Sequence, residues 1–260
     1  DLCRSLHHPL GSSAMMAGCD VCQFLDWDSD FFGRRIGRVT THSLTPDSVQ
    51  SILEWCHARQ IDCLYFLCNA DDGNTVRLAE DSGFRLVDIR MTLERQVDGA
   101  RPVQGASGEG IIRVCALGDI PPLRSIAGAT HRDSRFYKDP NFPRELCDAL
   151  YATWIEKSCR GYADTVLVVE LDGQPVGYVS CHLHSGSRGQ IGLIGVGAGS
   201  QGKGLGGTLV NASLDWFASR QMTRVTVVTQ GRNVKALRLY QKCGFLVQSV
   251  QLWYHRWFLT

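Results

Sequence analysis

The same pattern occurs twice in this 260-residue sequence, and it limits the folds that the chain can adopt. Residues 63–95 and 224–256 each contain an apolar or β-branched run, a helical segment, a Gly-Phe pair and a closing strand that ends in Arg. From Gly83 onward the offset between the copies is constant at 161 residues. Self-similarity at a fixed spacing indicates a duplicated structural unit. We therefore infer an ancient duplication of a strand–helix–strand unit.

The two copies differ at positions that could carry chemistry. Ala79 in the first copy occupies the place of Tyr240 in the second, and nothing in the first half resembles the glycine-rich segment 201–207. If Tyr240 takes part in a reaction, we expect the first copy to be inactive.

A segment rich in Gly, Pro and Ser, residues 98–110, separates two strand-like stretches and is typical of a linker. Beyond it, predicted strands alternate with predicted helices, and this order favours a mixed sheet with helices on its faces, the α/β or α+β class. We expect a disordered tail over residues 1–20, a smaller truncated domain without catalytic motifs over 21–97, and a catalytic domain over 111–260.

Composition excludes several classes of protein. With 44% hydrophobic and 20% charged residues, the chain is neither disordered nor collagen-like. No apolar run approaches the roughly 18 to 20 residues of a membrane span, so we expect a cytoplasmic protein with no membrane span. The net charge of +1 combines −6 over residues 1–100 with +7 over residues 101–260, and the basic half suits an anionic ligand. Because there is no Lys/Arg run, we expect no nucleic-acid partner.

The 11 cysteines are odd in number and scattered, which is typical of reduced cytosolic thiols. Cys19 and Cys22 form one CxxC pair, but no second pair of Cys or His stands at zinc spacing. We expect no metal.

The glycine-rich segment 201–207 (QGKGLGG) lies between a predicted strand end and a predicted helix. Glycines let the backbone approach a ligand, and the N–H groups and dipole at a helix N-terminus favour a pyrophosphate. The Walker A spacing and the dinucleotide-binding pattern are both absent. The alternative interpretation is a glycine-rich turn with no ligand.

Two motifs together resemble one known family. Gln-x-x-Gly-x-Gly from Gln201, after a strand that ends in Val196, is similar to the coenzyme A loop of the GNAT superfamily of N-acyltransferases. Residues 233–245 (NVKALRLYQKCGF) match the GNAT signature Asn-x-x-Ala-x-x-Leu-Tyr-x-x-x-Gly-Phe at every specified position. The resemblance implies a GNAT fold with a mixed, mostly antiparallel sheet and acetyl-CoA as cosubstrate. It implies coenzyme contacts at Ile194, Gly195, Val196, Gln201, Gly202, Lys203, Gly204, Leu205, Gly206, Gly207, Asn233, Ala236 and Leu239.

By the same resemblance, Tyr240 lies near the thioester sulfur and is the expected catalytic residue. A phenol with a pKa of about 10 can protonate a departing thiolate whose conjugate acid has a pKa of about 8.5. The resemblance also implies that the strand 191–196 parts from its neighbour, so that its N–H groups polarise the thioester carbonyl. The alternatives are a core tyrosine and an ordinary buried strand.

No motif identifies the general base that removes a proton from the attacking ammonium group. A water chain to bulk solvent is one route. The candidate side chains are His131, Asp133, His182, His184 and His255.

The acceptor is less constrained than the cofactor. A resemblance to the TDP-fucosamine acetyltransferases is carried by residues 25–33 and by the loop that contains Arg135, Phe136 and Tyr137. The resemblance extends over about residues 22–256. It implies an acceptor amine on nucleotide-linked 4-amino-4,6-dideoxygalactose. The composition of the loop would itself suit a base and a diphosphate, because arginine forks fit phosphates and aromatic rings stack on heterocycles. The Gly244-Phe245 pair departs from that family. A loop folded over its own core is the alternative for this segment.

Other functions remain open at this point. The acceptor amine could belong to a protein N-terminus, an aminoglycoside or a polyamine, and a non-catalytic coenzyme A-binding module is a further alternative. The basic second half favours an anionic nucleotide sugar over a cationic acceptor. The acyl chain length and the oligomeric state are not determined, with a homodimer as one candidate assembly.

Overall fold

The computed structural model describes residues 21–97 and 110–258, which divide into two compact units. The first unit contains the described residues up to Arg90 together with those from Val250 onward, and the second is Met91–Ser249. The tail predicted over residues 1–20 and nearly all of the predicted linker lie outside the described residues.

The first unit is a sheet with three helices. Its strands, in the order of the sheet, are β1 (Cys22–Phe24), β2 (Ile36–Val39), β3 (Cys63–Asn69), the later residues of β10 (Leu246–Trp257) and the first residues of β4 (Arg85–Gln96). β2 and β3 are parallel, whereas β1/β2 and β3/β10 are antiparallel. Helix α2 (Asp26–Phe32) follows β1, and α3 (Pro46–Ala58) and α4 (Gly73–Asp81) bury apolar residues in the same core as β3.

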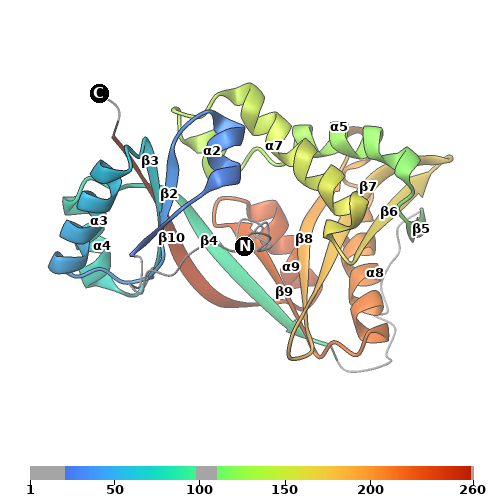
Figure 1. The fold of residues 1–260 in the computed structure, drawn as a ribbon. Helices are drawn as coiled ribbons and strands as arrows, with labels where there is room; N and C mark the ends of the chain where they lie inside the picture. Colours follow the sequence, from blue (N-terminus) through green and yellow to red (C-terminus); the bar gives the residue numbers. More distant parts are fainter. Residues whose placement is uncertain (1–20, 98–109, 259–260) are drawn as a thin grey trace. The chain divides into compact units, whose positions relative to one another are not determined.

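The second unit contains a larger sheet that begins with β4 (Arg85–Gln96) from residue 91. The sheet continues in the order β9 (Arg224–Gln230), β8 (Arg188–Val196), β7 (Gln174–His184), β6 (Thr165–Leu171) and β5 (Ile111–Val114). The strands from β5 to β8 are antiparallel to one another, and β9 runs parallel to β8 after helix α8 (Leu205–Ser219). Figure 1 shows both units.

Helices cover both faces of this second sheet (Figure 1). Val179 and Cys181 of β7 belong to the core that includes the apolar residues of α8 and α9 (Val234–Lys242). Side chains alternate along a strand, so Tyr178 lies on the opposite face, where α5 (Ile120–Thr130) packs with α7 (Arg144–Lys157). The short elements of this unit are η1 (Leu117–Asp119), α6 (Arg135–Lys138), η2 (Ser158–Tyr162) and η3 (Ala198–Ser200). The mixed sheet between helices confirms the predicted fold class.

The repeat seen in the sequence is also present in the secondary structure. Each of β9, α9 and β10 begins and ends 161 residues after its counterpart in the first repeat, which is β3, α4 and β4 respectively. Gly83 and Gly244, which follow the two helices, have φ angles of 81° and 80°, a conformation that favours glycine. These correspondences support the inferred duplication.

The last strand of each repeat is divided between the units. Residues 91–96 of β4 belong to the second unit, and residues 251–257 of β10 pair with β3 in the first. Neither repeat therefore lies within one unit of the structure. The domains at 21–97 and 111–260 stay a prediction. That the first unit is a truncated, inactive copy stays a prediction.

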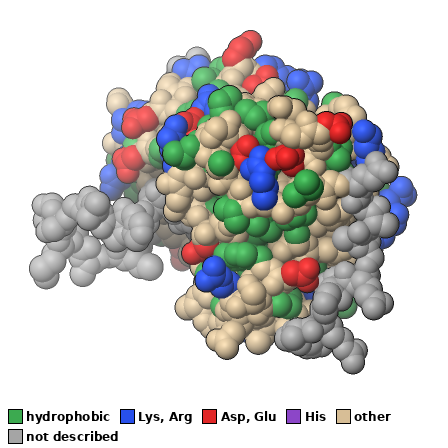
Figure 2. All heavy atoms as spheres, turned by 90° about the vertical axis from the view of Figure 1, so that its right-hand side faces the viewer, with side chains coloured by type: hydrophobic (Ala, Val, Ile, Leu, Met, Phe, Trp, Pro, Cys, Tyr) green, Lys and Arg blue, Asp and Glu red, His purple; other side chains and the backbone are tan. Residues whose placement is uncertain are grey.

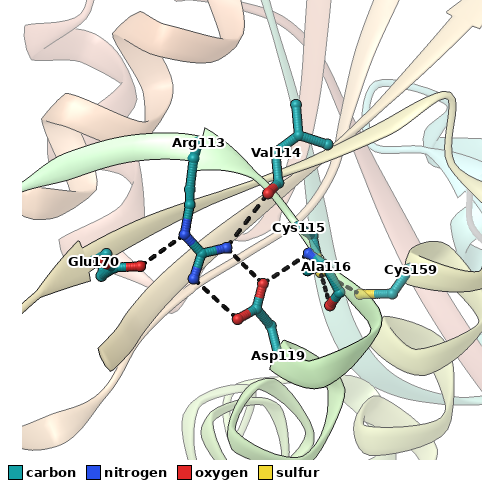
Figure 3. A network of polar contacts seen from close by, with 7 residues as sticks. All are labelled: Arg113, Val114, Cys115, Ala116, Asp119, Cys159 and Glu170. Carbon is teal, nitrogen blue, oxygen red and sulfur yellow. Dashed lines mark hydrogen bonds and ion pairs between the residues drawn. The ribbon is translucent and has the colours of Figure 1, made fainter. Parts of the chain in front are cut away.

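A polar network fastens the edge strand β5 to its neighbours (Figure 3). Arg113 binds Asp119 of η1 through two hydrogen bonds of 2.7 and 3.0 Å, and Glu170 of β6 at 2.7 Å. Asp119 also accepts a hydrogen bond from the Ala116 backbone at 2.7 Å, and these contacts, Arg113 foremost, lower the pKa of its carboxyl. The Sγ atoms of Cys115 and Cys159 lie 3.5 Å apart beside this network.

The surface of the second unit is chemically mixed. Figure 2 shows hydrophobic side chains among acidic and basic ones on the face that it presents. Near the β5 edge, Ile111, Val114 and Leu117 are 66%, 62% and 68% exposed. Within residues 21–97 and 110–258, no helix combines the length and the apolar character needed to cross a bilayer.

Candidate functional site

A cavity of about 1380 Å³ opens in the second unit, where β8 ends and α8 and α9 begin. It contains nearly all of the residues that the sequence predicts to contact a coenzyme. Lys203 is not among its lining residues, and neither are Arg135, Phe136 and Tyr137. The predicted residues that line it are Ile194, Gly195, Val196, Gln201, Gly202, Gly204, Leu205, Gly206, Gly207, Asn233, Ala236, Leu239 and Tyr240.

Strand β8 loses its β9 neighbour where it enters the cavity. The recorded pairs between β8 and β9 run from Arg188 with Arg224 to Ile191 with Val227 and end there. On its other edge β8 stays paired with β7 as far as Val196. In the described structure, the residues 192–196 therefore have one strand edge without a ladder partner, and Ile194, Gly195 and Val196 line the cavity. This is the parting of strands that the sequence predicts.

The turn from β8 into α8 depends on its glycines. Gly202 and Gly204 have φ angles of 82° and 78°, and only glycine adopts this conformation without strain. The Gln201 side chain donates to the Val196 carbonyl at 3.0 Å and closes the turn. Gly204 is the N-cap residue of α8, so the first N–H groups of this 15-residue helix lie beside the cavity at the positive end of the helix dipole.

Two further glycines at the start of α8 serve different purposes. A Cβ at Gly206 would lie 3.2 Å from Leu239 Cδ2, so glycine here lets α8 and α9 approach each other. A Cβ at Gly207 would meet no protein atom within 4 Å, and its φ angle is an ordinary one. Neither packing nor strain in the protein explains the second glycine, which lines the cavity.

Asn233 acts as the N-cap of α9. Its side chain accepts a hydrogen bond from the Ala236 backbone N–H at 3.1 Å. The Oδ1 atom is therefore used in the helix cap, whereas the amide Nδ2 group is the part that can serve a ligand. Part of the sequence motif is thus explained by helix capping.

Tyr240 is 3% exposed and lines the cavity from α9. Its ring packs edge-on against Phe245 with ring centres 5.8 Å apart, and its carbonyl accepts from the Phe245 backbone N–H. Burial raises the pKa of the Tyr240 hydroxyl above its ordinary value. The hydroxyl therefore keeps its proton throughout the neutral range and can act as a donor.

The cavity wall carries charges of both signs. Arg95, Lys235 and Lys242 supply cations, and Glu94 and Asp133 supply carboxylates. The Arg95 side chain donates to the Cys243 carbonyl at the end of α9. Polar and anionic ligand groups can therefore both be accommodated.

The structure adds cavity residues that the sequence does not identify as ligand contacts. Asn211 is 8% exposed and lines the cavity, and its Oδ1 atom has no hydrogen-bond partner in the part of the chain that the structure describes. It lies four residues after Gly207 on the same face of α8, so helical spacing could have found it. Thr130 reaches the cavity from the end of α5, and no local signal in the sequence marks it.

Of the candidate bases, only Asp133 is among the lining residues of this cavity. His131 and His182 are held inside the unit, where burial lowers the pKa of each to about 4. His184 lies 2.9 Å from Gln190, and His255 belongs to the first unit, where it stacks on Tyr65.

The three residues expected at the acceptor pack inside the unit instead. Arg135 lies 4.4 Å above the Phe136 ring, Phe136 packs edge-on against Phe142, and the Tyr137 hydroxyl donates to Asp148. All three expected residues are at most 9% exposed. This packing corresponds to the alternative of a loop folded over its own core, and a role in binding the acceptor stays a prediction. Within the described residues, no group of three or more His, Cys, Asp or Glu side chains is arranged to hold a metal.

Comparison with known proteins gives consistent results. The model of the Acetyltransferase (GNAT) family matches residues 129–245. The dTDP-fucosamine acetyltransferase of Escherichia coli O6:H1 is 32% identical over 244 residues, which cover 89% of this chain and 96% of that protein. The spore coat polysaccharide biosynthesis protein SpsD of Bacillus subtilis is 26% identical over 54% of this chain and 48% of its own length.

A solved structure shares the fold. The GCN5-related N-acetyltransferase from Sphaerobacter thermophilus superposes with a TM-score of 0.66 at 17% sequence identity. The match covers 91% of this chain and 76% of that one. The likeness confirms the predicted fold.

Proposed function

The chain belongs to the GNAT family of acetyltransferases, and from this premise we propose that it transfers the acetyl group of acetyl-CoA to the amine of a nucleotide-linked amino-deoxy sugar. The observation that carries the acceptor class is the similarity to a dTDP-fucosamine acetyltransferase, which extends over 89% of this chain and 96% of that protein. Similarity over both units, and not over the family motifs alone, favours a related acceptor.

The cavity fits acetyl-CoA at its glycine-rich end. Gly207 has no protein neighbour that would exclude a side chain, so the close approach of a ligand gives a reason for glycine there. The N–H groups at the start of α8 suit a pyrophosphate. Lys203 in the same turn and the Asn233 Nδ2 group are the side chains that we expect to add contacts to the phosphates and to the pantetheine arm.

The unpaired edge of β8 suits the thioester end. The backbone N–H groups of Ile194 and Val196 face the edge that has no β9 partner, whereas the N–H groups of the residues beside them, such as Gly197, face β7. Such groups can donate to a carbonyl oxygen as negative charge develops on it during attack by an amine. Acetyl-CoA would supply the activated acyl group, and the strand edge would hold its carbonyl in place.

Tyr240 is suited to protonate the departing thiolate. Its buried hydroxyl is protonated at neutral pH, since burial raises its pKa. The same low-polarity surroundings disfavour an unneutralised thiolate, so the pKa of the thiol rises as well and the cost of the transfer stays modest. In the equivalent position of the first repeat, Ala79 is completely buried and offers no such donor, which supports the proposal that this copy is inactive.

The proposal is tested by incubating the protein with acetyl-CoA and a panel of amines, and then measuring free thiol and product mass. The panel contains dTDP-4-amino-4,6-dideoxygalactose, a second nucleotide-linked amino sugar, an aminoglycoside, a polyamine and a peptide. We expect acetylation of the nucleotide-linked sugars and inhibition by free dTDP. Preferred acetylation of the polyamine or the peptide, without inhibition by dTDP, would contradict the proposed acceptor class while leaving the acetyltransferase assignment intact.

A further inference from the structure

A chain of hydrogen bonds connects the buried interior of the second unit to the cavity. Thr130, the last residue of α5, donates its hydroxyl proton to the Ile126 carbonyl at 2.8 Å. The Thr130 hydroxyl is also hydrogen-bonded to the hydroxyl of Tyr178, a completely buried residue of β7. On the far side of Tyr178, the His131 Nε2 atom lies 2.9 Å from the same hydroxyl.

The acceptor role of the Thr130 oxygen follows from counting protons. A hydroxyl group has one proton to donate, and Thr130 gives it to Ile126. The lone pairs of the Thr130 oxygen are then left to accept. The His131 Nε2 atom pairs with the Tyr178 hydroxyl, in a role that its tautomer decides. Burial lowers the pKa of His131 to about 4, so the ring is neutral at pH 7.

Packing holds the participants in place. The His131 ring stacks on Tyr151 with ring centres 4.6 Å apart and an interplanar angle of 14°. Tyr178 is the β7 partner of Gly195, and a Cβ at Gly195 would lie 3.0 Å from the Tyr178 ring and 3.1 Å from Thr130 Oγ1. Glycine at this position therefore lets Thr130 and Tyr178 approach the part of β8 that lines the cavity.

The Thr130 oxygen that results is a fixed acceptor at the cavity. Its proton is donated to Ile126, so the oxygen can meet a ligand only as an acceptor. Thr130 lines the cavity together with Gly195. Asp133, three residues further along the chain, also lines it, and an ionised carboxylate can only accept hydrogen bonds. An amine brings N–H donors and, before it loses its proton, a positive charge, and both properties match this part of the wall.

We propose that the Thr130 hydroxyl accepts a hydrogen bond from the N–H of the attacking amine and orients its lone pair toward the thioester, with Tyr178 and His131 as positioning residues. The inference rests on the proposed function, because it takes the thioester to lie along residues 194–196. It requires no proton transfer along the chain. The role of Thr130 is to hold the nucleophile, and the role of the two residues behind it is to keep the Thr130 lone pair directed at the cavity.

The test uses two coenzyme A conjugates that differ in one group. In S-(carboxymethyl)-CoA N-methylamide an N–H stands where the amine would join the acetyl group, and in the matched methyl ester an oxygen replaces it. The dissociation constants of both are measured for the unchanged protein and for Thr130→Ser, Thr130→Val and Tyr178→Phe. Thermal unfolding of each variant and its affinity for plain coenzyme A show whether the fold and the cofactor site are intact.

We expect the amide to bind roughly 5- to 10-fold more tightly than the ester to the unchanged protein and to Thr130→Ser, as for one hydrogen bond. Thr130→Val should bind both equally, and Tyr178→Phe should show a reduced preference. Equal preference for the amide in Thr130→Val and Thr130→Ser would overturn the inference, as would equal binding of both conjugates by the unchanged protein. If neither conjugate nor coenzyme A binds, the proposed function fails together with the inference that depends on it.

The kinetics with the amino sugar separate the two proposals. Formation of product by the unchanged protein supports the proposed acetyl transfer. A value of kcat/KM for the sugar that is lowered in Thr130→Val and restored in Thr130→Ser supports the role of Thr130 as well. Equal kinetics in Thr130→Val and Thr130→Ser contradict only the role of Thr130. Absence of sugar acetylation by an otherwise intact protein contradicts the proposed acceptor, and the conjugates still decide the role of Thr130.

Discussion

Asn233 and Asp72 occupy equivalent positions in the two repeats and cap their helices in the same way. The side chain of each accepts a hydrogen bond from the backbone N–H three residues later, at 3.1 Å, from Ala236 and Thr75 respectively. One cap lies at the cavity, and the other belongs to the repeat in which Ala79 replaces the tyrosine. The capping role is therefore separable from any role in binding coenzyme A.

Substitutions at these two caps should separate stability from binding. Asn233→Asp keeps a cap but loses the Nδ2 donor, so we expect nearly unchanged stability and weaker acetyl-CoA binding. Asn233→Ala should lose both the cap and the donor, so we expect weaker acetyl-CoA binding and a free energy of unfolding that is lower by about 1 kcal/mol. Asp72→Ala is the matched control, which should lose stability without loss of affinity. Urea unfolding and calorimetric titration measure the two properties, and undiminished affinity in Asn233→Asp would rule out the Nδ2 contact.

Substitution of Tyr240 should affect the rate more than binding. Tyr240→Phe removes the acid without removing the ring that packs on Phe245, so we expect kcat to fall roughly 10²-fold with a similar KM. Because burial raises the pKa of the hydroxyl, the acid form persists to alkaline pH, and activity should fall only above about pH 10. A pH–rate profile checks both points, and a loss of activity centred near pH 8 would assign the titration to another group.

Two neighbouring glycines provide an internal comparison. Gly207→Ala adds a Cβ that meets no protein atom within 4 Å, so helix propensity should stabilise the fold by up to about 1 kcal/mol. The same methyl group should obstruct acetyl-CoA and lower its affinity at least tenfold. In Gly206→Ala the new Cβ would lie 3.2 Å from Leu239 Cδ2, and this crowding between α8 and α9 should cancel the gain in stability from helix propensity. Titration calorimetry and thermal unfolding check both variants, and full affinity in Gly207→Ala would contradict the proposed position of the coenzyme.

The buried histidines should make stability depend on mildly acidic pH. The pKa of His131 is lowered to about 4 by burial, so below about pH 6.5 the unfolded chain binds a proton that the folded chain does not. The free energy of unfolding therefore decreases as the pH falls from 6.5 toward 4, by at most about 1.4 kcal/mol per pH unit for each such histidine. His131→Gln should flatten this dependence in urea unfolding series. An unchanged slope in that variant would show that His131 does not contribute.

Cys115 and Cys159 should form a disulfide under mild oxidation. Their Sγ atoms are 3.5 Å apart and both residues are partly exposed, whereas the other free cysteines among the described residues are buried. With oxidised dithiothreitol, two thiols become one disulfide and the reagent is reduced to its dithiol. We expect a cross-linked peptide by mass spectrometry and a stability gain of about 2–4 kcal/mol. Cys159→Ser is the control, and absence of the cross-link in the unchanged protein would contradict the prediction.

The sequence predicts those parts of the site that are encoded locally. The glycine-rich turn and the segment 233–245 each lie within one strand–helix connection, so their spacing alone brings Gly204 and Tyr240 to the cavity. The bounds of the repeat are predictable for the same reason, because a fixed offset of 161 residues needs no tertiary information.

The remaining features depend on tertiary contacts. Thr130 reaches the cavity because α5 packs across β7 and β8, and nothing near it in the sequence marks that position. The division of β4 and β10 between the units depends on strand pairing that sequence patterns do not encode. Arg135, Phe136 and Tyr137 have the composition of a nucleotide contact, but aromatic and basic side chains can equally pack on one another, as they do here.

The proposed acetyl transfer to a nucleotide-linked amino sugar is tested most directly by the mass of the product. The protein is incubated with acetyl-CoA and dTDP-4-amino-4,6-dideoxygalactose, with Tyr240→Phe measured in parallel. We expect the sugar nucleotide to gain one acetyl group as one equivalent of free thiol appears, with much slower conversion by the variant. Release of thiol without acetylated sugar, or no reaction of this sugar while another amine is acetylated, would contradict the account.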